Sequence, residues 1–82
     1  MNRSYDLCTA SMRSMTFALK AQKFLEGAGV YSYIVKLDGS ATRRGCAYGV
    51  TFYCASGDAV RRIFRNERIS VSQYIQGGGE KI

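Results

Sequence analysis

The segment Cys46–Cys54, with the sequence CAYGVTFYC, constrains the fold more than any other part of this chain. Its side chains alternate between a large apolar set and a small, partly polar set, the period-two pattern of a strand with one buried face. The large set is Cys46, Tyr48, Val50, Phe52 and Cys54, and the small set is Ala47, Gly49, Thr51 and Tyr53. We therefore predict a strand whose large face packs in the core and whose small face is open.

Residue spacing predicts five further elements around this strand. Strand-like segments are Ser4–Met12, Val30–Lys36 and Ile69–Ile75. A helix is expected from an N-cap at Ser14, with Ser11 as the alternative cap, to Ala28, and a second from Ser56–Asp58 to Glu67. The expected buried stripes are Phe17, Ala18, Ala21, Phe24, Leu25 and Ala28 on the first helix, and Ala59, Val60, Ile63 and Phe64 on the second.

The resulting order βαββαβ predicts an α+β fold, a ferredoxin-like sandwich. Its four-stranded antiparallel sheet carries both helices on one face. Right-handed crossovers place the first and third strands side by side in the centre. The third strand then begins where the first strand ends and the first helix starts, so Cys46 is expected near that helix N-terminus. Residues 1–76 form the predicted single domain, and the glycine-rich residues 77–82 a flexible tail.

The composition excludes several classes of chemistry. The chain has 82 residues, no histidine and three cysteines. It therefore has no Ser-His or Cys-His pair, and without CxxC spacing neither a zinc site nor a closed disulfide framework is expected. No apolar run resembles a membrane span or an export signal, which favours a cytoplasmic protein with reduced thiols. We predict no metal, no cofactor and no membrane partner.

The charge is strongly positive, with twelve Lys and Arg against six Asp and Glu, or +6. Such a chain attracts anions, including nucleic acids and acidic protein surfaces. Arginines concentrate at two places, first Arg43 and Arg44, then Arg61, Arg62, Arg65 and Arg68. The second group also fits a merely solvated helix face.

Cys46 is the strongest candidate for chemistry. It follows Gly45, Arg43 and Arg44 at a predicted loop-to-strand junction. Nearby cations and a helix N-terminus both favour thiolate over thiol, and an accessible thiolate suits sulfur transfer or redox chemistry. The alternative is a packed cysteine at the start of a strand. Core packing is the expected role of Cys8 and Cys54, although Cys8 is also a candidate resolving thiol for Cys46.

Two stretches of the sequence, ALKAQKFLEGAGV (18–30) and GCAYGVTF (45–52), resemble a family of short bacterial proteins described as selenium- or sulfur-carrier-like. The family pattern has a helix of the type A-L-K-A-E-K-x-L-x-x-A-G-I and a later strand of the type C-G-L-A-L-R-F, whose cysteine aligns with Cys46. This chain departs from it at Gln22, Ala47 and Thr51. The resemblance implies a carrier, not an enzyme, that holds sulfur or selenium on Cys46. A cysteine desulfurase-like donor and an acceptor protein would be its partners.

Two other functions remain open. The segment from Arg44 to Phe52 approaches the K/R-G-F/Y-G/A-F-V-x-F/Y signature of the RNA-recognition module, but with one extra residue. Because a one-residue insertion exchanges the faces of a strand, Tyr48 would share the core face with Val50 and Phe52, which argues against RNA binding. Tyr31, Tyr33 and Tyr53 could still stack on bases. The other alternative is an interaction module or homodimer that uses the open sheet face.

Overall fold

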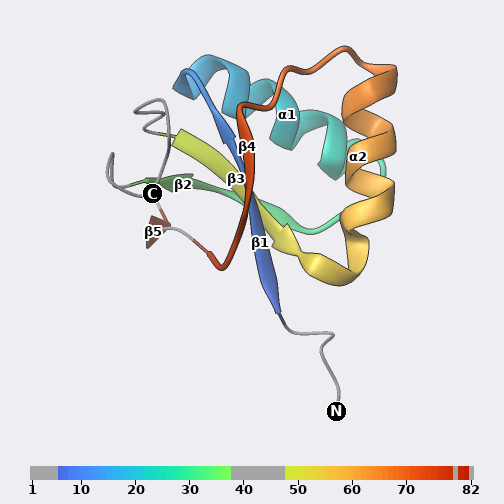
Figure 1. The fold of residues 1–82 in the computed structure, drawn as a ribbon. Coiled ribbons are helices and arrows are strands. Elements are labelled where there is room, and N and C mark those ends of the chain that lie inside the picture. Colours follow the sequence, from blue (N-terminus) through green and yellow to red (C-terminus); the bar gives the residue numbers. More distant parts are fainter. Residues whose placement is uncertain (1–5, 38–47, 79, 82) are drawn as a thin grey trace.

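The computed structural model describes residues 6–37, 48–78 and 80–81. Its elements are β1 (Leu7–Met12), α1 (Met15–Gly27), β2 (Ser32–Lys36), β3 (Tyr48–Tyr53), the 3-10 turn η2 (Cys54–Ser56), α2 (Gly57–Asn66), β4 (Gln73–Gln76) and β5 (Glu80–Lys81). The strands form one antiparallel sheet in the order β4-β1-β3-β2-β5. The predicted α+β class is confirmed, and the order of the first four strands fits a ferredoxin-like sandwich (Figure 1).

The centre of the sheet is the β1–β3 pair, as the crossover argument predicts. Leu7 lies opposite Tyr53, and Met12 lies opposite Tyr48. The chain leaves β1 at Met12 and enters α1 through Ser14, whose hydroxyl accepts a hydrogen bond from the Phe17 amide at 3.3 Å. The described beginning of β3 therefore lies beside the segment that starts α1.

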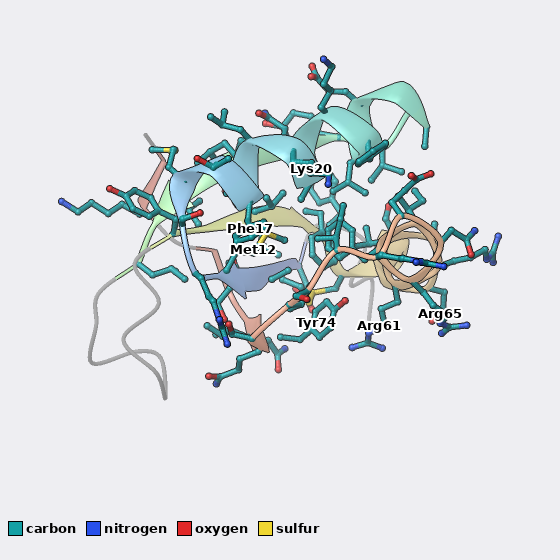
Figure 2. The ribbon with its side chains drawn as sticks, turned by 90° about the horizontal axis from the view of Figure 1, so that it is seen from above. Met12, Phe17, Lys20, Arg61, Arg65 and Tyr74 are labelled. Carbon is teal, nitrogen blue, oxygen red and sulfur yellow. A yellow bond between two sulfur atoms is a disulfide. The ribbon has the colours of Figure 1, made fainter. Side chains whose placement is uncertain are left out.

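The hydrophobic core lies between the sheet and the two helices. Its buried members are Ala10 and Met12 of β1, Val50 and Phe52 of β3, Ala18, Ala21 and Leu25 of α1, and Val60 and Phe64 of α2. Because one set of strand residues meets both helices, the helices cover the same face of the sheet (Figures 1 and 2). The predicted large face of the third strand is confirmed by Val50 and Phe52.

The buried stripe of α1 is narrower than predicted. Phe17 is 46% exposed, and Ala28 is exposed as well. Phe17 lies in the first turn of α1, where it lines a small surface cavity of about 370 Å³ with Arg13 and residues 70–72. Ala28 caps the other end of the helix. Both residues therefore lie at the ends of the helix, beyond its buried middle.

The second face of the sheet is covered, and the prediction that it is open is wrong. Thr9, Ser11 and Thr51 are at most 1% exposed, and Val35 and Gly49 are buried. Pairing of Val35 with Gly49, and of Thr9 with Thr51, places these residues on the face opposite the helices. This face therefore forms a second, partly polar interior.

The connection from β4 to β5 explains how that face is buried. The two strands lie at opposite edges of the sheet, four inter-strand spacings apart, or about 19 Å in a flat sheet. Gln76 and Glu80 are only four residues apart, a reach of about 14 Å. The sheet must therefore curl toward its second face.

Gly78, Glu80 and Lys81 of the C-terminal segment lie along the sheet. A Cβ atom on Gly78 would lie 3.2 Å from Leu7 Cδ1 and 3.5 Å from Thr51 Cγ2, so Gly78 lies against the second face. Glu80 then pairs with Lys36 of β2. Glycine allows this close approach because a side chain at residue 78 would compete with the sheet for space.

Candidate functional site

The residues of the predicted carrier site lie outside the described residues. These are Cys46, Arg43, Arg44 and Gly45. The nearest described residue of β3 is Tyr48, which pairs with Met12 on one side and Lys36 on the other. The structure therefore describes the strand that follows the candidate thiol and the helix start beside that strand.

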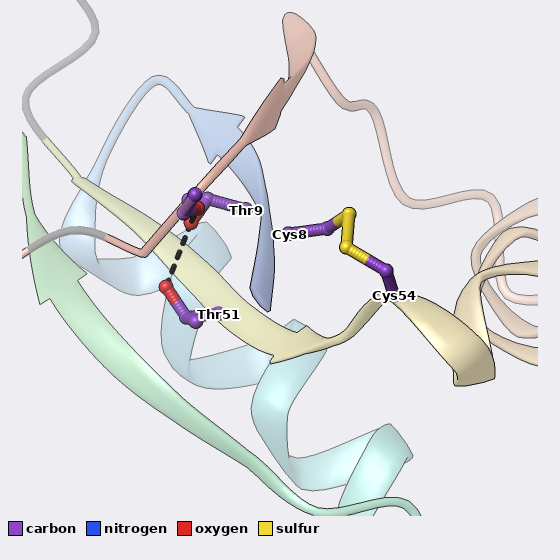
Figure 3. The surroundings of a disulfide bond; sticks show 5 residues. Cys8, Thr9, Thr51 and Cys54 are labelled. Carbon is purple, nitrogen blue, oxygen red and sulfur yellow. Dashed lines mark hydrogen bonds between the residues drawn. A yellow bond between two sulfur atoms is a disulfide. The ribbon is translucent and has the colours of Figure 1, made fainter. Parts of the chain in front are cut away.

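The other two cysteines form a disulfide, which differs from the expectation of three reduced thiols. The Sγ atoms of Cys8 and Cys54 are 1.98 Å apart, and their Cα atoms are 5.1 Å apart (Figure 3). Cys8 is consequently not a free resolving thiol for Cys46. The bond links β1 to the residue directly after β3, where the Cys54 amide donates to the Asp6 carbonyl at 2.8 Å.

The positions of the two cysteines in the sequence are themselves a signal for this bond. Cys8 and Cys54 both belong to the predicted core faces of the first and third strands, which the topology places side by side. The observed register puts Cys8 opposite Phe52, two residues before Cys54. Two cysteines on one face of neighbouring strands are within the Cα separation that a disulfide needs.

A cavity of about 730 Å³ lies against the disulfide. The residues that line it include Cys8 and Cys54, Phe52, Asp58, Arg61 and Tyr74. It therefore lies where β1, β4 and the first turns of α2 meet. Its walls combine apolar surface with charges of both signs, and its volume is in the range of sites for small molecules.

One wall of this cavity is the pair formed by Arg61 and Tyr74. The Arg61 guanidinium carbon lies 4.7 Å from the centroid of the Tyr74 ring, a cation–π contact between α2 and β4 (Figure 2). Burial raises the pKa of the Tyr74 phenol above its ordinary value, while the charges of Arg61 and Arg65 act in the opposite direction. The phenol is thus held neutral, and the cation is fixed against its ring.

A second group of aromatic side chains joins β2 and β3. The rings of Tyr31 and Tyr53 stack with centroids 5.5 Å apart, and Tyr33 meets Tyr31 edge-on at 6.0 Å. Tyr31 is the most exposed of them, at 56%. The three tyrosines named as candidates for base stacking are therefore brought together, although two of the rings stack on each other.

The arrangement of β3 argues against the RNA-recognition module. Val50 and Phe52 are buried between the sheet and the helices, and Tyr48 packs against the same core. Tyr48, the aromatic position of the signature that the structure describes, therefore does not face outward.

Metal sites, membrane spans and similarity to known proteins are the remaining indications of function. In residues 6–37, 48–78 and 80–81 no cluster of acidic or cysteine side chains could hold a metal ion, and no helix there is long and apolar enough to cross a membrane. The chain matches no protein-family model, no curated protein and no solved structure.

Proposed function

We propose that this protein is a small carrier that holds a sulfur or selenium atom on the side chain of Cys46. The proposal rests on the resemblance of residues 18–30 and 45–52 to the carrier-like family, and the bond between Cys8 and Cys54 leaves Cys46 as the remaining cysteine of three. A carrier needs one thiol that accepts and releases a group, and a second free thiol beside it would expel the group by forming a disulfide.

The charge near Cys46 in the sequence supports the same function. Arg43 and Arg44 precede it by three and two residues, and the described part of β3 begins beside the start of α1. Cations and a helix N-terminus favour the thiolate, which is the nucleophile in sulfur transfer. The arginines would also attract an acidic surface on a donor or acceptor protein.

The loading step uses no oxidant. The Cys46 thiolate attacks the terminal sulfur of a persulfide on the donor protein. The sulfur–sulfur bond of the donor breaks, its cysteine leaves as a thiolate, and the transferred sulfur keeps its proton as the Cys46 persulfide. Delivery to an acceptor nucleophile repeats this exchange with Cys46 as the leaving thiolate.

Intact-mass analysis after incubation with a cysteine desulfurase and cysteine tests the proposal. Wild type should gain one sulfur that reductant removes, and Cys46→Ala should gain none. A Cys8→Ala/Cys54→Ala double variant should still be loaded if it is folded by circular dichroism. A parallel arm with a selenocysteine lyase and selenocysteine distinguishes selenium from sulfur. Failure of wild type to gain either atom would overturn the proposal.

A further inference from the structure

The disulfide is placed where a small molecule can reach it. Cys8 and Cys54 are each only partly buried, and both line the cavity of about 730 Å³. Here part of its surroundings is open volume, large enough for a ligand the size of an amino acid or short peptide.

The two sulfur atoms lie in different electrostatic surroundings. Cys54 is in the turn η2, which leads directly into the ten-residue helix α2 at Gly57. The N-terminal end of a helix stabilises a thiolate. Cys8 lies within β1 and has no helix terminus of this kind next to it in sequence. Cys54 is therefore the better leaving group when the bond is attacked.

The charged side chains at the cavity select the kind of thiol. Arg61 is exposed but held against the Tyr74 ring, so its remaining donors can meet a carboxylate. Asp58, in the first turn of α2, offers a carboxylate to a cation. The Arg61 guanidinium and the carboxylates of Asp6 and Asp58, beside an apolar wall, match the carboxylate, ammonium and methylene groups of an amino-acid thiol.

We propose that the bond between Cys8 and Cys54 is an exchange site for low-molecular-weight amino-acid thiols bound in this cavity. The incoming thiolate attacks Cys8 Sγ and forms a mixed disulfide there, while the electron pair of the broken bond leaves on Cys54. A second thiolate attacks the small-molecule sulfur of that mixed disulfide and releases Cys8. Two thiols are thereby oxidised to one disulfide, and their two protons and two electrons remain on the protein thiols.

The experiment uses folded protein in which Cys46→Ser is present throughout, so that the third thiol takes no part and the result is independent of the carrier function. Glutathione is the charged probe and 2-mercaptoethanol the neutral one. Intact mass and peptide mapping after an acid quench follow the mixed disulfide. Circular dichroism establishes that each variant is folded.

We expect a mixed disulfide on Cys8 in the absence of denaturant. Arg61→Gln should lower the rate with glutathione about fivefold, the effect of losing one exposed charge pair, and leave the rate with 2-mercaptoethanol unchanged. Arg62→Gln is the matched control, because Arg62 is also exposed on α2 but is not among the residues that line the cavity. It should change neither rate.

Two results would overturn the inference. If thiol–disulfide exchange is no faster than global unfolding in the same buffer, thiols reach the bond only in the unfolded chain, and the bond is purely structural. An equal effect of Arg61→Gln on both thiols would show that the cavity does not select a carboxylate-bearing thiol.

Discussion

The hydroxyl groups of Thr9 and Thr51 lie 2.8 Å apart across the β1–β3 pair, on the sheet face opposite the helices (Figure 3). The Thr9 hydroxyl is also 2.7 Å from the Gly77 carbonyl and donates to it. Because the one proton of the Thr9 hydroxyl is used in that bond, the Thr51 hydroxyl donates to the Thr9 oxygen. Both side chains are almost fully buried. This chain of hydrogen bonds fastens the segment after β4 to the middle of the sheet.

The first prediction concerns that chain of hydrogen bonds. Thr9→Val should lower the free energy of unfolding by about 1–3 kcal/mol, because it removes the hydrogen bonds that the buried Thr9 hydroxyl makes with Thr51 and the Gly77 carbonyl. In urea denaturation, the Thr9→Val/Thr51→Val double variant should lose less than the sum of the single variants, since the two hydroxyls share one bond. Strict additivity would contradict the coupling.

The second prediction concerns the close approach of β1 to β3 at Gly49. A Cβ atom on Gly49 would lie 2.7 Å from the Ala10 carbonyl oxygen, which is backbone and has little room to move. Gly49→Ala should therefore destabilise the protein by about 1–3 kcal/mol in urea denaturation.

Gly27 provides the control for that substitution. A Cβ atom at Gly27, the last residue of α1, would meet nothing within 4 Å. Gly27→Ala should be neutral or stabilise by up to about 1 kcal/mol through helix propensity. Equal losses at residues 27 and 49 would rule out steric contact with Ala10 as the cause.

The third prediction concerns the disulfide as a cross-link. Cys8 and Cys54 are 46 residues apart, so their bond removes much freedom from the unfolded chain. A Cys8→Ala/Cys54→Ala variant should be less stable by up to about 4 kcal/mol in the chain-entropy model. Urea denaturation of wild type with and without reductant gives the comparison, and reduced wild type should approach the double variant. Identical midpoints in all three samples would contradict a stabilising role.

The fourth prediction concerns the pH dependence caused by Tyr74. Its pKa is raised above the ordinary 10.0, with burial as the main cause. The unfolded chain therefore ionises this phenol at a lower pH than the folded protein does. The resulting stability is complete below pH 10.0 and is lost as the pH rises through the folded pKa.

Ultraviolet titration of the phenolates tests this shift. The difference between wild type and Tyr74→Phe isolates one phenol of the six tyrosines. It should titrate above pH 10.0, and in urea Tyr74→Phe should lose less stability than wild type between neutral and alkaline pH. A difference curve centred at or below the ordinary value would refute the burial argument.

The fifth prediction concerns Arg68, which has a positive φ of 57° directly after α2. This left-handed conformation ends the helix, and Ile69 N then donates to Phe64 O at 2.8 Å. Arg68→Gly should raise the free energy of unfolding by about 1 kcal/mol, because glycine adopts this conformation without a steric cost. Arg62→Gly, in the helix interior, should instead destabilise by about 1 kcal/mol. A loss of stability in Arg68→Gly would contradict the prediction.

The helix-facing side of the sheet was predictable residue by residue because strand period fixes which side chains share a face. Val50 and Phe52 were assigned to the core from alternation alone. The N-cap at Ser14 was equally predictable, since its hydroxyl bonds an amide three residues later. Such features depend on residues that are close together in the sequence, so a local sequence pattern can predict them.

The cavity beside the disulfide could not be predicted in the same way. It needs Cys8 from β1, Arg61 from α2 and Tyr74 from β4, whose approach depends on the crossing of separate elements. The pairing of Cys8 with Cys54 was within reach, because the predicted topology placed both on one face. The carrier function of Cys46 stays a prediction, as its segment lies outside the described residues.

The sequence alone determined the order of the helices and strands from β1 to β4, the α+β class, the core face of β3 and the choice of Cys46 as the candidate thiol. Each of these follows from spacing or composition within one segment. Only the tertiary structure decided that the second sheet face is buried, because the short link from Gln76 to Glu80 forces the edges of the sheet toward each other. It also decided that Cys8 and Cys54 are bonded beside a cavity, since a bond across 46 residues depends on how distant strands meet.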